Sequence, residues 1–261
     1  MDNSNIEKMG QHISEQFNKK LEELHTKVLT MGGLVERQIE LAVQAFTTGD
    51  SELAERVIKQ DNDVDELEMA IDLECMQLLA LRQPAAFDLR LLITVIKVVH
   101  ELERVGDHAE RVAKMAIQLA GDSDKFPHHE LEHMAELVKG MLHDALDAFA
   151  RMTLEDVPAI TERDDNVDRE YDNIVRQLIT RMMEDPRNIT RTLDVLWTVR
   201  ALERIGDHSV YICEHLVFMI KGEDVRHLSQ KELEEKIYGT TIERRKDRRV
   251  EDVDLELFRK D

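Results

Sequence analysis

The chain has 261 residues, of which 55 are acidic and 35 are basic, so its formal net charge is −20 at pH 7. A chain this acidic is unsuited to sequence-independent nucleic-acid binding, which depends on Lys and Arg side chains that neutralise phosphates. Aromatic residues make up only 4% of the chain, and Gly and Pro are scarce. Because this composition favours helices over strands, it predicts an all-α protein.

Apolar residues recur at three- and four-residue spacing through most of the chain, which predicts a series of long amphipathic helices. The expected helices cover about 7–48, 51–82, 87–121, 129–152, 156–184 and 190–221, and a short one covers 229–238. Gly32-Gly33 interrupts the first of them and predicts either a kink or a point of close packing, because glycine costs a helix about 1 kcal/mol relative to alanine. Residues 121–127 are expected to be a linker, and the charged tail 240–261 to be mobile or dependent on a partner.

A seven-residue motif occurs twice, at an offset of one hundred residues. Leu102-Glu103-Arg104-Val105-Gly106-Asp107-His108 returns as Leu202-Glu203-Arg204-Ile205-Gly206-Asp207-His208. Such a fixed offset marks an internal repeat, so the two halves should share one fold. We therefore expect two tandem three-helix bundles, over 1–121 and 128–222, and a C-terminal extension over 223–261.

Each copy of the motif places two acids on the rim of an apolar helical stripe. Glu103 and Asp107 are four residues apart and so lie within about 40° of each other around the helix. Glu203 and Asp207 in the second copy of the motif have the same spacing. Gly106 falls inside the stripe, where a missing side chain lets a neighbouring helix approach closely. Upstream, each half holds another acid pair of the same spacing, and antiparallel hairpins would bring the pairs level. The eight acids are Asp61, Asp65, Glu103, Asp107, Asp164, Asp168, Glu203 and Asp207.

Four carboxylates at one level of each bundle repel one another, and the cost grows where water is excluded. Hard or borderline cations such as Mg²⁺, Mn²⁺, iron or Zn²⁺ would neutralise them. Two other outcomes are open: the acids are solvated, or they pair with nearby arginines such as Arg104, Arg111, Arg200 and Arg204. The repeated histidines, His108 and His208, project away from the acid rim, which favours surface or interhelical roles over ligation.

These residues resemble those of the PhoU family of bacterial phosphate-signalling regulators, over roughly residues 7–238. The resemblance implies two similar three-helix bundles whose paired E(D)xxxD motifs, the eight acids above, hold metal ions. It also implies a cytoplasmic, often homodimeric protein without enzymatic activity. Its expected partners at the inner membrane are PstB, the ATPase of the phosphate transporter, and the sensor kinase PhoR. Such a protein would repress the phosphate-starvation response and restrain phosphate uptake.

Two alternatives come from other functional classes. A carboxylate-bridged di-iron enzyme of the ferritin-like type needs Glu-x-x-His motifs, and Glu22/His25 and Glu130/His133 have that spacing. A metal-free helical scaffold would leave the acids solvated. Cys75 and Cys213 have no CxxC partner and are expected to be small core residues. The absence of a signal pattern and of any long apolar run leads us to expect a cytosolic protein.

Overall fold

The computed structural model describes residues 3–82, 84, 86–120 and 129–239, and this part of the chain contains helices but no strands. The long helices are α1 (Asn3–Thr48), α2 (Ser51–Arg82), α3 (Ala86–Leu119), α4 (His129–Arg151), α5 (Val157–Glu184) and α6 (Ile189–Lys221). A 3-10 turn, η1 (Pro186–Asn188), joins α5 to α6, and the short helix α7 (Gln230–Tyr238) follows. The helix boundaries expected from the sequence agree with these to within a few residues, and the all-α prediction is confirmed.

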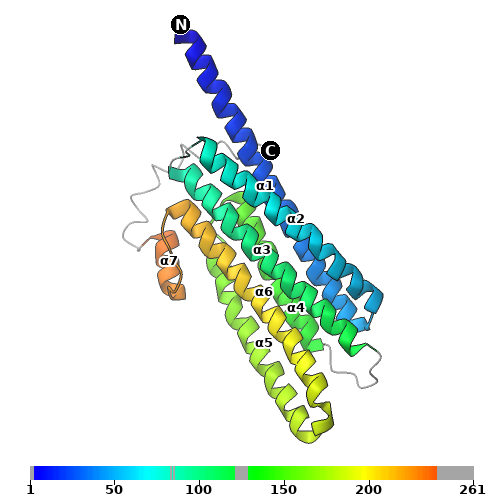
Figure 1. Ribbon diagram of the computed structural model, residues 1–261. Helices are drawn as coiled ribbons and strands as arrows, with labels where there is room; N and C mark the ends of the chain where they lie inside the picture. The colour runs from blue at the N-terminus through cyan, green and yellow to red at the C-terminus, as the bar shows by residue number, and fades with distance from the viewer. Residues whose placement is uncertain (1–2, 83, 85, 121–128, 240–261) are drawn as a thin grey trace.

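The helices form two three-helix bundles that lie side by side (Figure 1). The first bundle consists of α1, α2 and α3, and the second of α4, α5 and α6. Helices α3 and α6, which carry the repeated motif, make the most extensive contact in the molecule, and α1 also packs on α4. The buried apolar side chains of both bundles form one continuous core. Helices α3 and α6 lie against each other in its centre.

Two glycines and a cap explain where helices begin and end. Gly49 adopts a φ of +71° after α1, and the carboxylate of Asp50 accepts a hydrogen bond of 2.9 Å from the backbone N–H of Leu53. Thr48-Gly49-Asp50 thus ends α1 and supplies the N-cap of α2. At the end of α6, Gly222 lies in the left-handed region and its N–H donates to the carbonyl of Phe218 at 2.8 Å.

The glycine pair in α1 marks close packing rather than a break, since α1 is one uninterrupted helix. A Cβ on Gly32 would lie 2.8 Å from a side-chain carbon of Leu146 on α4, whereas one on Gly33 would meet nothing within 4 Å. Gly32 therefore lets the first bundle approach the second at this point.

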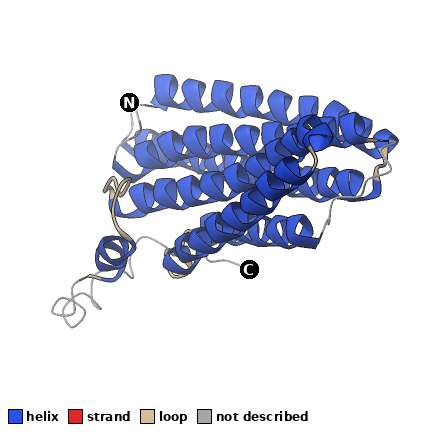
Figure 2. Ribbon diagram, turned by 90° about the horizontal axis from the view of Figure 1, so that it is seen from below, coloured by secondary structure: helices blue, strands red, loops and turns tan. Residues whose placement is uncertain are grey.

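Helix α7 lies to one side of the six long helices (Figure 2). Ser229 and Glu232 form a capping box at its start, and Leu233 is buried. The amide of Gln230 donates to the carbonyl of Pro158 at 2.7 Å, which ties α7 to the beginning of α5. The linker and the charged tail inferred from the sequence, 121–127 and 240–261, lie outside the described residues. None of the helices within the described ranges is both long and apolar enough to cross a membrane.

Candidate metal centre

The four acids of the first bundle lie on two neighbouring helices, as the hairpin argument predicts. Asp61 and Asp65 belong to α2, and Glu103 and Asp107 belong to α3. Asp61 is buried, with 9% of its surface exposed. One carboxylate oxygen each from Asp61, Asp107 and a further α3 acid, Glu110, can be chosen so that all three lie within 4.8 Å of one another. Three oxygen donors at this separation are a plausible core for binding a divalent cation.

The repeated glycine gives α2 room to approach α3 beside the acids. A Cβ on Gly106 would lie 3.0 Å from Oδ1 of Asp61 and 3.3 Å from Oε1 of Gln38. The amide of Gln38 on α1 donates to the same Asp61 oxygen at 3.2 Å, while its own Oε1 is buried without a hydrogen-bond partner. The first bundle thus gathers acceptor oxygens from all three of its helices at one place.

The electrostatics of this cluster favour protons or cations. Burial raises the pKa of Asp61 to about 6, against a hydrogen bond from Gln38 that lowers it, and the charges of Glu110, Asp65 and Asp107 add to the increase. Burial also raises the pKa of Glu103 to about 7, with further contributions from Asp107 and other neighbouring acids. Carboxylates that stay partly protonated near neutral pH have too little compensating positive charge around them.

The second bundle repeats the arrangement of acids. Asp164 and Asp168 lie on α5, and Glu203 and Asp207 lie on α6. Burial raises the pKa of Asp164 to about 7, and the charges of the other three acids raise it further. A Cβ on Gly206 would lie 3.2 Å from Oδ1 of Asp164, which matches the close approach in the first bundle.

Arginines neutralise part of the second cluster. Arg200 donates to Glu203 at 2.6 Å, and Arg204 donates to Asp207 at 2.8 Å. Glu203 itself is buried, with 8% exposure. Where the structure describes the second bundle, no three ligand groups come as close together as those of the first. The arginine-pairing alternative is thus found for two acids of the second bundle, while no described arginine forms an ion pair with Glu103 or Asp107.

The donor set of the first bundle therefore fits a hard or borderline cation that displaces Lys114 from Glu110, whereas the second cluster would have to exchange its contacts with Arg200 and Arg204 for one. Two residues of the first cluster, Gln38 and Glu110, were missed by the sequence analysis, which relied on the repeat. The second bundle has Val138 of α4 where the first has Gln38 of α1: a Cβ on Gly206 would lie 3.6 Å from Val138, as one on Gly106 would lie 3.3 Å from Gln38. The offset of the motif likewise pairs Glu110 with Val210. Three-residue spacing from Asp107 is the signal that could have identified Glu110.

The repeated histidines act between the bundles, as expected. The rings of His108 on α3 and His208 on α6 stack with their centroids 5.4 Å apart. Nδ1 of His208 also lies 2.6 Å from Oε2 of Glu101, and Nε2 of His215 lies 3.5 Å from the other oxygen of the same carboxylate. Burial would raise the pKa of Glu101, but the two histidines lower it to about 2. This carboxylate therefore helps to hold α3 against α6.

Neither Glu-x-x-His motif forms a metal site in the described chain. The groups there that could hold an ion include none of Glu22, His25, Glu130 and His133. The ring of His25 instead stacks on Phe149 at 5.5 Å, and burial lowers its pKa. Cys75 and Cys213 are free and fully buried, as expected for core residues.

Comparison with known proteins bears on both halves. A family model described as the PhoU domain matches residues 28–116 and again residues 131–216. The phosphate-specific transport system accessory protein PhoU homolog of Pseudomonas putida is 45% identical over 91% of this chain and 93% of its own length. The phosphate-specific transport system accessory protein PhoU of Escherichia coli K12 is 44% identical, over 92% of this chain and 98% of its own.

Solved structures agree with the sequence comparisons. The crystal structure of PhoU from Pseudomonas aeruginosa has a TM-score of 0.76 and 45% identity, covering 79% of this chain and all of the other. The crystal structure of the phosphate transport system regulatory protein PhoU from Streptococcus pneumoniae has a TM-score of 0.75 and 33% identity, covering 80% of this chain and 99% of the other. With two matches to the family model and relatives aligned over almost their whole length, the chain belongs to the PhoU family.

Proposed function

We propose that this chain is a cytoplasmic adaptor that represses the phosphate-starvation response. In this proposal it connects PstB, the ATPase of the phosphate transporter, to the sensor kinase PhoR, and it restrains phosphate uptake when phosphate is plentiful. The observation that carries the proposal is the similarity over more than nine-tenths of the chain to proteins named as phosphate-specific transport system accessory proteins. The name of an accessory protein fits a role in contact and regulation rather than turnover.

The surface of the molecule supports an adaptor. The hairpin of α5 and α6 projects beyond the other helices (Figure 1) and exposes large apolar side chains on both arms. These are Ile179, Met183, Ile189, Leu193 and Trp197, which are between 40% and 79% exposed. Exposed apolar side chains on an otherwise acidic protein are suited to contact with a partner, while the charge sets orientation and association rate. A second copy of the chain, as in a homodimer, is one such partner.

Metal binding is the second part of the proposal. We propose that Asp61, Asp65, Glu103 and Asp107 hold an ion in the first bundle, with Glu110 as an added ligand, and that Asp164, Asp168, Glu203 and Asp207 form the corresponding site. All-oxygen donors suit Mg²⁺, Mn²⁺ or iron, and Zn²⁺ is also compatible with carboxylates. A bound ion would neutralise acids that burial and mutual repulsion otherwise leave partly protonated. Its role is to stabilise the bundle in the form that meets the partners.

A deletion strain tests the regulatory part. We expect removal of the protein from its host to leave starvation genes, such as the one for alkaline phosphatase, expressed in phosphate-rich medium, and a plasmid copy to restore repression. Purified protein should bind PstB or the cytoplasmic part of PhoR, and more weakly at high salt because exposed charges are screened. Normal repression in the deletion strain, together with no binding to either partner at low salt, would contradict the proposal.

A further inference from the structure

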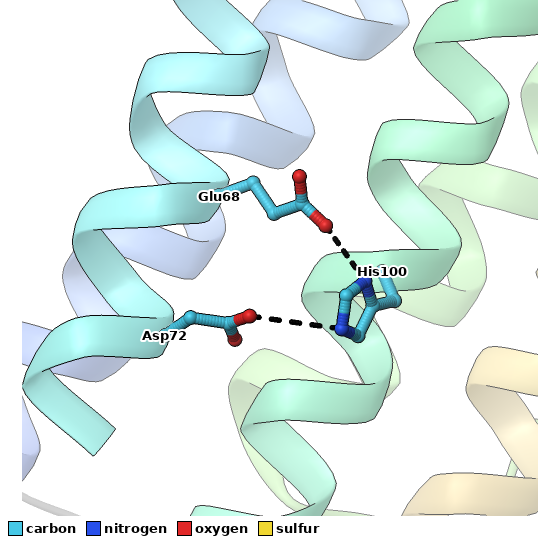
Figure 3. A group of neighbouring side chains, drawn as sticks. All are labelled: Glu68, Asp72 and His100. Carbon is cyan, nitrogen blue, oxygen red and sulfur yellow. Dashed lines mark ion pairs between the residues drawn. The ribbon is translucent and has the colours of Figure 1, made fainter. Parts of the chain in front are cut away.

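A second group of potential ligands lies farther along the same two helices and contains a histidine. Glu68 and Asp72 extend from α2 toward His100 on α3, whose ring lies between the two carboxylates (Figure 3). Nδ1 of His100 is 2.6 Å from Oε1 of Glu68, and Nε2 is 3.6 Å from Oδ2 of Asp72. None of these three residues belongs to the repeated acid pairs or to the seven-residue motif.

The geometry of this group suits an ion. One donor atom from each residue can be chosen so that all three lie within 4.8 Å of one another. Ligands about 2.1 Å from a metal are roughly 3 to 3.5 Å apart, so Nδ1 of His100 and Oε1 of Glu68, which are 2.6 Å apart, would have to separate to admit an ion. His100 can make such a shift because its side chain is 53% exposed. The remaining oxygen of Asp72, Oδ1, is buried and has no hydrogen-bond partner, so this carboxylate has an acceptor that the histidine does not satisfy.

The internal repeat supplies a comparison for this site. The offsets that relate the acid pairs of the two halves bring Glu68, Asp72 and His100 onto Tyr171, Val175 and Arg200. There Arg200 lies over the ring of Tyr171, 5.5 Å from its centroid, and pairs with Glu203. At the same place in the fold, the second bundle therefore carries a fixed cation and an aromatic ring, while the first carries three metal-ligating side chains.

From this difference we propose that Glu68, Asp72 and His100 form a site for a single divalent transition-metal ion, separate from the carboxylate clusters. The bound ion takes the place that the guanidinium of Arg200 occupies in the second bundle. One imidazole nitrogen and two carboxylate oxygens suit ions that accept nitrogen ligands, such as Zn²⁺ and Mn²⁺, better than Mg²⁺ or Ca²⁺. The site is open to solvent on the side of His100, so water molecules complete the coordination. The proposal does not depend on the regulatory role.

Nitrogen coordination distinguishes this site from the carboxylate clusters, whose nine proposed ligands all bind through oxygen. The full-length protein is stripped with a chelator and titrated with Mn²⁺, and pulsed EPR is used to detect ¹⁴N coupling from a bound imidazole. We expect the wild-type protein to show this coupling and His100→Asn to lose it. The matched control is His143→Asn, because His143 on α4 contacts a single carboxylate, that of Glu36, at 2.9 Å. This control should keep the signal.

A second variant keeps the test decisive if the histidine change affects folding. Asp72→Val introduces the residue that the second bundle carries at this position, so the helix should tolerate it, and we expect Mn²⁺ to bind to the His100 site at least about tenfold more weakly. Circular dichroism confirms that each variant is folded. Absence of ¹⁴N coupling in the wild-type protein, or its persistence at full strength in His100→Asn or Asp72→Val, would overturn the proposal. Loss of starvation-gene repression is not part of this readout, so the two proposals can fail independently.

Discussion

The two bundles solve one electrostatic problem in different ways. Both place a glycine of α3 or α6 against an aspartate, the buried Asp61 or the partly buried Asp164, and both surround that aspartate with further acids. In the second bundle, Arg200 and Arg204 pair with two of these acids. In the first, Gln38 and Glu110 add oxygen atoms, and Lys114 pairs with Glu110 rather than with one of the repeated acids.

The difference shows that two repeats can share the same pattern of acidic residues while different side chains neutralise those acids. Acid spacing is kept because it follows from residues at fixed positions on two helices. The compensating charge of the second bundle comes from the same helix as Glu203 and Asp207: Arg204 has a counterpart in Arg104, but Arg200 stands where the first bundle has His100. A cation from solution therefore has more to contribute in the first bundle than in the second, and this expectation can be tested with variants.

The largest effect should come from adding metal to chelated protein. An ion present at one hundred times its dissociation constant stabilises the folded state by about 2.7 kcal/mol, which corresponds to a rise in Tm of roughly 5 to 10 °C for a chain of this size. We expect Asp61→Asn with Asp107→Asn to remove most of the rise, and Asp164→Asn with Asp207→Asn to remove less. Calorimetry with and without Mn²⁺ measures both. Equal losses would show that the bundles bind metal alike, and no loss in either would remove the ligand assignment.

Removing Arg200 should make the acid cluster of the second bundle depend on a bound cation, as we expect for the first. Arg200→Ala removes the hydrogen bond to the buried Glu203, leaves it only the longer contact with Arg204 at 3.9 Å, and should cost the metal-free protein about 1 to 2 kcal/mol. Arg104→Ala is the matched control, because no described acid pairs with Arg104, and it should cost less than about 0.5 kcal/mol. Urea unfolding gives both values. If Mn²⁺ fails to restore stability to Arg200→Ala, the second cluster does not accept an ion in place of the guanidinium.

Substituting the two motif glycines by alanine should have smaller effects, and these effects should differ between the bundles. A Cβ on Gly106 would press on Asp61 and Gln38 at 3.0 and 3.3 Å, whereas one on Gly206 would lie 3.2 Å from Asp164. We expect Gly106→Ala to weaken Mn²⁺ binding roughly tenfold, or about 1.4 kcal/mol, and Gly206→Ala to weaken it less. The stability of the metal-free protein should change little, because alanine also favours the helix. Isothermal titration on the two variants provides the comparison, and unchanged affinity in Gly106→Ala would show that Asp61 moves freely.

The smallest effect concerns pH. In the folded chain the pKa values of Glu103 and Asp164 are raised to about 7, so near neutral pH the folded state binds more protons than the unfolded state. The free energy of unfolding of the metal-free protein should therefore decrease, by less than about 1 kcal/mol for each of the two groups, as the pH rises from about 6.5 to 8. Glu103→Gln and Asp164→Asn should each flatten the slope. A stability that rises over this range would contradict the assigned proton binding.

This pH window avoids a second titration. Burial, with the charge of His208 next, lowers the pKa of His108 to about 4, so that group changes stability below about pH 6.5 in the opposite direction. Saturating Mn²⁺ should remove the decrease above pH 6.5, because metal-bound carboxylates do not hold protons.

The sequence by itself determined the helices, the repeat and the level of the acid pairs. These properties depend on periodicity, on turn residues such as Pro186 and on counting residues from a turn at 1.5 Å per residue, all of which are local. It also determined that Gly106 and Gly206 lie on the packed side of their helices. The sequence could not decide between a kink and close packing at Gly32, because the answer depends on Leu146 of another helix.

Only the tertiary structure decided which side chains surround each acid. Gln38 comes from α1, Glu110 lies outside the repeat, and His100 meets Glu68 and Asp72 across two helices. Sequence spacing fixes the direction of a side chain around its own helix, but the neighbour it meets depends on how the helices rotate and pack against one another. The pairing of Arg204 with Asp207 is local by contrast, because the two residues are three positions apart on α6.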